Sequence, residues 1–455
     1  MNIKQKKINK SALVVLSVLS TASFFVYHLL LDQHYRLNAD EYACMSYAKN
    51  GILGIGYAWR FYLTREGNFL SFLLQGVGMH ALAHGFPPIL FFFTLKCGLW
   101  LAIYWFFHTL FSQLGLLFDV ASKITVASVF ITCLYLISSN QSEIWHWAIG
   151  SMAYVLPIIF VLLSATFILR DQVYAALLPL AFLMQSRATY AVLFFAAVLL
   201  YFAYDYTINR ARAKRNLSLS LVLLCLLLIY VFAPGNSARL PQVHFSSSFL
   251  MGQFFRELKN VFVSFNFAKL DRVAMGLLVM IPLLPKTPYS MNKRWVIIPG
   301  LLYLLFVLAH AGLFVLATGY AAWTRVLSMH SFLFLALCIF YAHFLYYRTN
   351  FAPRINLILS LFAFLILTAN LYRKLPENLK KAETFSAAYD RQWERIFAYK
   401  GGETDTLILN IMPDPGVPCY FPFGEEPSYW INADFCKAYH LDFKIAREKK
   451  EVKKH

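Results

Sequence analysis

Long apolar segments recur along almost the whole chain and alternate with short polar or basic connections. Crossing a bilayer takes about 20 predominantly apolar residues, a length that residues 11–31 already reach. Further spans are predicted at 86–111, 122–139, 147–169, 173–185, 188–206, 216–233, 273–285, 295–317, 326–347 and 355–372. The pattern predicts an all-α polytopic membrane protein with about eleven transmembrane helices, of which 173–185 and 273–285 are short enough to be tilted, broken or re-entrant.

The connection after the first span is unusually long and mixed in character. It covers residues 32–85, and two stretches within it, 52–62 and 69–83, combine apolar and polar positions as helices at the membrane surface do. We therefore expect interfacial helices in this loop.

The amino-acid composition also distinguishes this chain from soluble proteins. Hydrophobic residues make up 59% of the chain and charged residues 14%, against about 25% charged in soluble domains, which excludes an ordinary soluble enzyme. The chain has 41 Lys and Arg against 23 Asp and Glu, but the basic residues gather in short loops and form no compact patch, so we expect no nucleic-acid partner.

The basic residues also orient the chain. The N-terminal lysines and the basic connections at 170, 210–215, 286–294 and 348–354 fall on one predicted side, which the positive-inside tendency places in the cytoplasm. An odd number of spans then puts residues 373–455 outside. The chain divides into a transmembrane domain, 1–372, and a small extracytoplasmic α/β appendage, 373–455, with helices predicted at 388–399 and 429–439 and a strand at 406–412.

The seven cysteines show no Cys-x-x-Cys pair and no zinc-ligand spacing. Only Cys419 and Cys436 lie together in a polar region. A disulfide between them in an oxidising compartment and two unpaired thiols both remain open.

Adjacent carboxylates, Asp40 and Glu41, follow the first span on the predicted outer side. One interpretation is a solvated helix start, in which Asn38 caps the helix and both acids favour its dipole. The other is catalytic: one carboxylate is a general base for an acceptor hydroxyl, and its neighbour positions that group or holds a divalent cation.

A second polar group, Glu143, Trp145 and His146, lies on a short outer loop. An aromatic belt at the membrane boundary and a binding site for a sugar or lipid headgroup would use the same residues. Glu143 and His146 are three residues apart and would share a face if this stretch is helical. Asp40, Glu41, Glu143 and His146 together would offer oxygen and nitrogen ligands to a divalent cation if the two loops meet.

Three isolated arginines, Arg187, Arg239 and Arg325, lie on the outer side against the positive-inside tendency. Each is open to a local explanation, a salt bridge or a snorkelling side chain. Guanidinium is also the side chain best suited to grip phosphate, and the turn at Asn236, before Arg239, can direct backbone N–H groups at an anion. Carboxylates, arginines and aromatic side chains on one face are what transfer from a lipid-linked phosphate donor requires.

The chain resembles the GT-C superfamily of multi-pass glycosyltransferases, which use polyprenyl-phosphate sugars and carry an acidic motif in the first extracytoplasmic loop. It is most similar to a largely uncharacterised bacterial family within or near that group. The matching residues are Asp40-Glu41, Gly67-Asn68-Phe69-Leu70, Trp147 to Tyr154, Pro234-Gly235-Asn236 with Arg239, and Trp430-Ile431-Asn432. Asn68 stands where that family's pattern has Arg, and the Trp147-to-Tyr154 interval is looser than the pattern.

The resemblance implies a glycosyltransferase of the bacterial inner membrane, which transfers a sugar from a polyprenyl-phosphate-linked donor to an envelope glycan or other surface acceptor with inversion at the sugar carbon. It implies that Asp40 is the base, that Glu41 and Glu143 are its partners or metal contacts, and that Arg187, Arg239 and Arg325 contact the donor phosphate. A transporter or flippase, and a polymerase or ligase of lipid-linked saccharides, are the alternatives.

Overall fold

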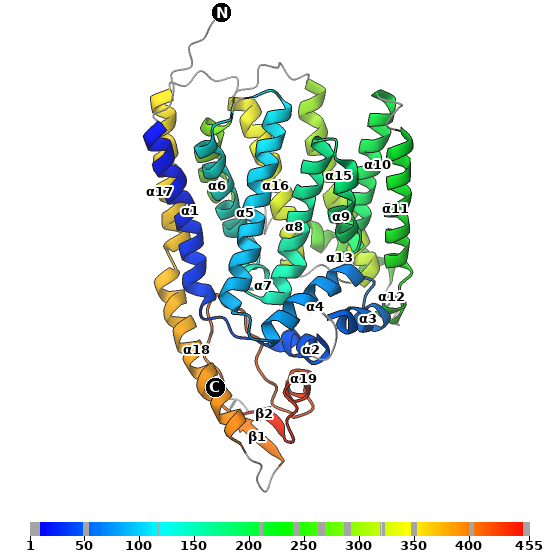
Figure 1. The fold of residues 1–455 in the computed structure, drawn as a ribbon, viewed down its shortest axis with the longest axis vertical. Coiled ribbons are helices and arrows are strands. Elements are labelled where there is room, and N and C mark those ends of the chain that lie inside the picture. Colours follow the sequence, from blue (N-terminus) through cyan, green and yellow to red (C-terminus); the bar gives the residue numbers. More distant parts are fainter. Residues whose placement is uncertain are drawn as a thin grey trace, which may run out of the picture.

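The structure is a computed structural model that describes residues 10–48, 54–116, 118–186, 188–208, 213–239, 246–262, 269–285, 293–318, 320, 324–346, 353–399 and 405–448. Its described part is a bundle of long helices packed side by side, with shorter helices across one end (Figure 1). The lengthwise helices are α1 (Lys10–Asp32), α5 (Pro88–Gln113), α6 (Val120–Ile137), α8 (Ala148–Leu169), α9 (Val173–Met184), α10 (Ala188–Ile208), α11 (Ala213–Val231), α14 (Leu270–Met280), α15 (Lys293–Thr318), α16 (Ser328–Tyr346) and α17 (Pro353–Tyr372).

Seven helices among the described residues are long and apolar enough to cross a membrane, judged by length and composition. They lie at Lys10–Asp32, Pro88–Gln113, Val120–Ile137, Ala148–Leu169, Ile297–Leu316, Arg325–Leu345 and Ile358–Ala398. Shorter apolar helices include Val173–Met184, Tyr190–Ala203 and Asn216–Val231. A mostly helical membrane protein is therefore confirmed, whereas the count of eleven spans stays a prediction.

The short span predicted at 273–285 is broken in the structure. Helix α14 ends at Met280 and the chain continues as a 3₁₀ turn, η4 (Ile281–Leu283). Pro282 lies within this turn, where its missing N–H and its ring disfavour a longer α-helix.

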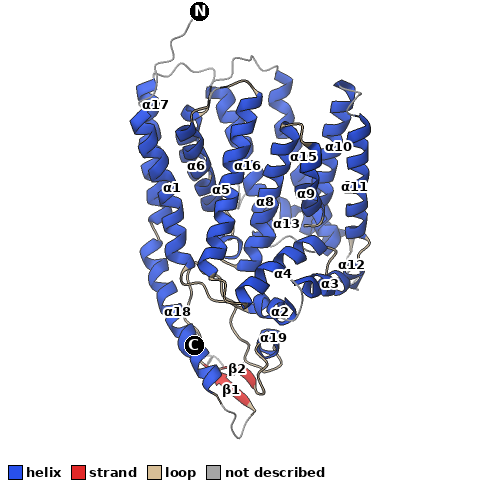
Figure 2. Ribbon diagram, viewed as in Figure 1, coloured by secondary structure: helices blue, strands red, loops and turns tan. Residues whose placement is uncertain are grey.

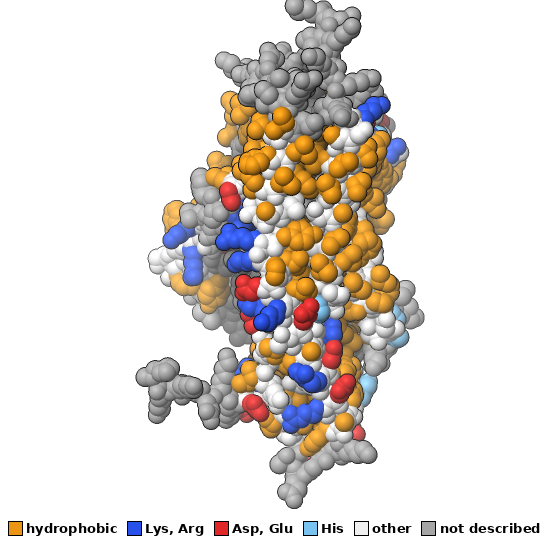
Figure 3. Space-filling model, turned by 90° about the vertical axis from the view of Figure 1, so that its left-hand side faces the viewer, with side chains coloured by type: hydrophobic (Ala, Val, Ile, Leu, Met, Phe, Trp, Pro, Cys, Tyr) orange, Lys and Arg blue, Asp and Glu red, His pale blue; other side chains and the backbone are white. Residues whose placement is uncertain are grey.

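The core of the bundle surrounds α6, which contacts α1, α5, α14 and α16. Asp119 caps this helix by accepting hydrogen bonds from the N–H groups of Ala121 and Ser122, which have no partner within the helix. Hydrophobic side chains cover the upper and middle part of the face shown in Figure 3, and charged side chains gather mainly below them. This division is typical of a protein embedded in a bilayer.

Three short helices cover one end of the bundle, which we call the capped end (Figure 1). They are α2 (Ala39–Ala48), α3 (Ile55–Thr64) and α4 (Phe69–Ala83). The helix predicted at 69–83 is confirmed with the same bounds, and the one predicted at 52–62 corresponds to α3. At or near this end the chain also forms α7 (Gln141–Trp145), α12 (Pro234–Arg239) and α13 (Ser247–Lys259). The 3₁₀ turn η5 (Thr324–Leu327) meets α7 through the ion pair of Arg325 with Glu143.

The C-terminal segment lies at the same end. Helix α18 (Leu375–Ala398) continues the direction of α17, and the chain then forms β1 (Thr406–Leu409), α19 (Trp430–Ala438) and β2 (Lys444–Arg447). The two strands, red in Figure 2, pair in parallel. The strand at 406 and the helix at 430 were predicted. The helix predicted at 388–399 begins earlier, at Leu375. The second strand was not predicted, because β2 has only two apolar residues, Ile445 and Ala446, between Lys444 and Arg447.

Candidate functional site

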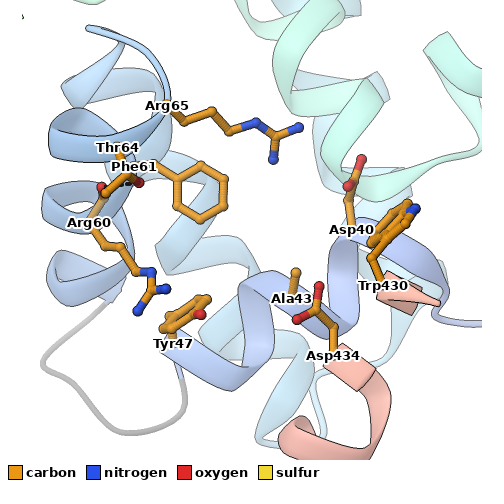
Figure 4. A pocket seen from close by; sticks show the side chains of 9 residues that line it. All are labelled: Asp40, Ala43, Tyr47, Arg60, Phe61, Thr64, Arg65, Trp430 and Asp434. Carbon is orange, nitrogen blue, oxygen red and sulfur yellow. Dashed lines mark hydrogen bonds between the residues drawn. The ribbon is translucent and has the colours of Figure 1, made fainter. Parts of the chain in front are cut away.

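A cavity of about 340 Å³ opens at the capped end between α2, α3 and α19. Its wall combines two carboxylates, two guanidinium groups and three aromatic rings (Figure 4). The lining residues are Asp40, Ala43, Tyr47, Arg60, Phe61, Thr64, Arg65, Trp430 and Asp434. Residues from the start and the end of the chain therefore share one site.

Asp40 lies in the first turn of α2 and its carboxylate lines the cavity. Figure 4 shows the side chain of Arg65 extending toward it from the opposite wall. Burial raises the pKa of Asp40, and the positive charges of Arg65 and Arg325 oppose that rise. A carboxylate with a raised pKa is a stronger base than an exposed one, which suits general-base chemistry near neutral pH.

Glu41 lies next in sequence but does not line the cavity. Its side chain is fully buried and accepts hydrogen bonds from the hydroxyl of Tyr35, from the N–H of Asn38 at 2.7 Å and from the N–H of Ala148 at 3.1 Å. The Asn38 bond closes the first turn of α2, as a capping box does, and the Ala148 bond satisfies the first amide of α8. Burial outweighs these bonds and raises the pKa of Glu41 to about 8. Glu41 therefore joins the start of α2 to α8, and Asp40 is the carboxylate of the pair that lines the cavity.

Arg60 and Arg65 supply the positive charge of the cavity. The Arg60 guanidinium lies 4.2 Å from the ring centroid of Tyr47, and that of Arg65 lies 5.3 Å from the ring centroid of Phe61. We did not predict either residue. The signal that singled out Arg187, Arg239 and Arg325, a basic residue on the predicted outer side, applies equally to these two and would have found them.

The Pro-Gly-Asn turn braces the connection between α3 and α4. Asn236 accepts a hydrogen bond from the N–H of Gly67 at 2.9 Å and donates one to the carbonyl of Tyr230 at 2.5 Å. A Cβ atom on Gly235 would lie 2.7 Å from the backbone nitrogen of Arg65, too close for any side chain. The Asn236 side chain therefore holds the turn that carries Arg65, and the anion contact expected at Asn236 stays a prediction.

Helix α19 contributes Trp430 and Asp434. Asn432, between them, donates to the carbonyls of Gly424, Glu426 and Ile445 and accepts from the N–H of Gly424, all at 2.9–3.0 Å. One of these bonds joins α19 to β2 and the other three join it to the loop at 424–426, and together they orient its cavity face. Burial raises the pKa of Asp434; the charge of Asp40 adds to the rise, and nearby Lys437 opposes it.

Glu143 and Arg325 meet beside the cavity. The Arg325 guanidinium donates to the Glu143 carboxylate at 2.5 Å and lies 5.5 Å from the ring centroid of Trp147. Because Arg325 also acts on the pKa of Asp40, this ion pair is close enough to influence the cavity electrostatically. Of the three predicted arginines, Arg187 lies outside the described residues, and Arg239 ends α12 with a side chain outside the described part.

Trp145 and His146 are buried in the core and line no part of the cavity. The indole N–H of Trp145 donates to the Ser138 hydroxyl at 2.9 Å, and Nδ1 of His146 lies 2.8 Å from the Asp32 carboxylate. Glu143 and His146 would share a face only if both lay in a helix, but α7 ends at Trp145, and the two side chains take different partners. A loop sequence shows which residues it holds but not which of them turn inward.

The remaining predictions for this region concern cysteines and a cation. Cys419 and Cys436 are both unpaired thiols, and burial raises the pKa of Cys419. Asp40, Glu41, Glu143 and His146 do not converge as a ligand set in the described part of the chain. The group there with metal-ligand geometry is His28, Asp32 and His146.

Comparisons of this chain with protein-family models, with curated proteins and with solved structures find no match. The resemblance to GT-C glycosyltransferases therefore stays a prediction. The cavity itself combines a carboxylate of raised pKa, two guanidinium groups and aromatic rings at one end of a bundle of apolar helices.

Proposed function

We propose that this chain is an integral-membrane glycosyltransferase that moves a sugar from a polyprenyl-phosphate-linked donor to an acceptor hydroxyl of a surface glycan. The observation that carries the proposal is the cavity at the capped end, where Asp40 faces Arg65 across a space of about 340 Å³. The resemblance of the Asp40-Glu41 pair to the acidic motif of GT-C enzymes agrees with it.

In the proposed reaction Asp40 is the general base. Its carboxylate takes the proton of the acceptor hydroxyl while the acceptor oxygen forms a bond to the anomeric carbon of the sugar. The bond between that carbon and the phosphate oxygen breaks on the opposite face, so the configuration inverts. Asp434, which shares the cavity, is placed to hold another hydroxyl of the acceptor.

The leaving lipid phosphate carries the negative charge that develops. Arg60 and Arg65 line the same cavity and would stabilise this charge through paired N–H donors. Trp430 and Tyr47 offer ring faces to the apolar side of a sugar. The lining therefore offers aromatic rings for the sugar, guanidinium groups for the phosphate and a carboxylate as the base.

We further propose that the protein lies in the bacterial inner membrane with the capped end outside the cytoplasm. The apolar helices support a membrane location, and the basic connections support the orientation. The polyprenyl chain of the donor would stay in the bilayer while its phosphate reaches the cavity at the surface.

The test is a comparison of the surface glycan, by mass spectrometry and linkage analysis, in cells that lack the gene and in cells complemented with a variant. Asp40→Asn removes the charge at almost constant volume. We expect the null strain to lack one sugar, and Asp40→Asn, present at normal level in the membrane, to fail to restore it, since a general base contributes about 10²–10⁴-fold to the rate.

The matched control is Asp442→Asn, the same change at an exposed carboxylate of the C-terminal segment. It should restore the glycan fully. Restoration by Asp40→Asn as well would contradict the catalytic assignment and favour a transporter or flippase for a lipid-linked saccharide.

A further inference from the structure

A second polar group lies inside the bundle, separate from the cavity lining. His28 and Asp32 occupy successive turns of α1, and His146 follows α7. One potential ligand atom from each of the three residues lies within 4.8 Å of the other two. The i and i+4 positions on a helix share a face, so His28 and Asp32 approach His146 together.

All three side chains are almost completely buried, at 1–2% exposure. Both ring nitrogens of His28 and Nε2 of His146 have no hydrogen-bond partner. The neighbours of His28 are instead rings, among them Phe24 at 4.4 Å and His146 at 5.1 Å between centroids. A buried polar atom without a partner costs about 1–3 kcal/mol, so an imidazole kept in such a place calls for an explanation.

We propose that His28, Asp32 and His146 form a binding site for a divalent transition metal ion such as zinc. Two imidazoles and one carboxylate are ligands that zinc accepts, and three protein ligands leave a fourth position for water. Zinc–ligand bonds of about 2.0–2.2 Å place tetrahedral ligands about 3.4 Å apart, and three ligand atoms within 4.8 Å of one another are near enough to close around one ion. A metal ion would give a ring nitrogen of His28 the partner that it lacks.

Lys96 explains how the site stays stable without an ion. Its ammonium lies 2.5 Å from Oδ2 of Asp32, where it neutralises the buried carboxylate. The other oxygen, Oδ1, faces His146 at 2.8 Å. Lys96 thus takes the place of the cation as partner of Asp32, and it competes with a metal ion through charge repulsion.

The three residues join α1, which precedes α2, to the segment that follows α7. His146 precedes Trp147, which contacts Arg325, and Ala148, whose N–H binds Glu41. A bound ion would fix this segment to α1 and thereby steady the start of α2.

The test uses the full chain, purified in lipid nanodiscs without a polyhistidine tag, freed of metal with a chelator and then equilibrated with zinc. We expect about one zinc ion per chain, with an X-ray absorption spectrum that shows imidazole nitrogen and oxygen ligands and no sulfur. Asp32→Asn and His28→Phe should both lose this ion. Lys96→Met should bind zinc tighter, on the order of tenfold, because the competing charge is gone.

The matched control is His343→Phe. His343 is another histidine whose ring nitrogens both lack a partner, but it lies on α16 apart from the group, so its replacement should leave the zinc content unchanged. Thermal melting without zinc shows whether each variant folds. A wild-type chain that retains no zinc, or an Asp32→Asn variant that folds and keeps it, would overturn the proposal.

Discussion

At the scale of single residues, Asp40 and Glu41 show how neighbours in sequence receive different environments. Both lie in the first turn of α2, yet Asp40 lines the cavity while Glu41 is enclosed by Tyr35, Asn38 and Ala148. Successive residues of a helix point about 100° apart, which is enough to place one carboxylate in a site and the next in the core.

The raised pKa of Glu41 gives a prediction for stability against pH. The unfolded chain releases this proton near the ordinary value of 4.5, whereas the folded chain holds it to about 8. Between these values the folded state binds more protons, so its stability should fall as the pH rises, by up to about 1.4 kcal/mol per pH unit. The measurement is the melting temperature in detergent from pH 5 to pH 8.

The variant that isolates this effect is Glu41→Gln, which cannot titrate. Its melting temperature should depend less on pH over the same range, whereas Asp442→Asn should keep the wild-type dependence. Equal slopes in wild type and Glu41→Gln would assign the pH dependence to other groups.

At the scale of elements, two short motifs that are about 170 residues apart form one contact, with Gly67 and Asn236 joined by a hydrogen bond. The contact holds the end of α3 against α12 and so sets the position of Arg65. Motifs that resemble ligand-binding loops in the sequence act here as a brace for a cavity-lining residue.

This contact predicts that Gly235→Ala disturbs the cavity. Its Cβ would meet the backbone of Tyr62, Arg65 and Glu66 at 2.7 Å, and backbone atoms cannot turn aside as a flexible side chain does. We expect a lower melting temperature, by a destabilisation of about 1–3 kcal/mol, and loss of glycan restoration in cells.

Gly252→Ala is the control for this substitution. It lies in α13 with no atom within 4 Å of the added Cβ, so the variant should be neutral or slightly more stable, since Ala favours a helix over Gly by about 1 kcal/mol. Full function of Gly235→Ala would show that the brace is not needed to place Arg65.

At the scale of the whole molecule, the helix bundle supports the cavity, which lies at its capped end. The described N-terminal helix starts at the opposite end, and α18, α19 and both strands lie at the capped end (Figure 1). The first outer loop and the C-terminal segment therefore meet, although residues 86–372 separate them in the sequence.

This arrangement predicts the topology of the protein in the membrane. Alkaline phosphatase, which is active only after export, should be active when fused to the C-terminus and inactive when fused within the basic connection at 210–215. The physical reason is the positive-inside tendency, which keeps that connection in the cytoplasm. The opposite pattern of activity would place the cavity in the cytoplasm and contradict the proposed use of an outer-face donor.

The sequence by itself determined the membrane class, most helices and the helix at 69–83, because hydropathy and helix periodicity are local properties that neighbouring residues fix together. It also located Asp40, whose position after the first span needs no knowledge of the fold.

Only the tertiary structure decided which residues join Asp40. Arg65, Trp430 and Asp434 reach the cavity through packing between distant segments, and the hydropathy of each segment says nothing about its partner. The same holds for Trp145 and His146, which lie in a polar loop but turn into the core, where Ser138 and Asp32 bind them. The sequence determines which side chains are available, and the long-range contacts determine which of them face one another.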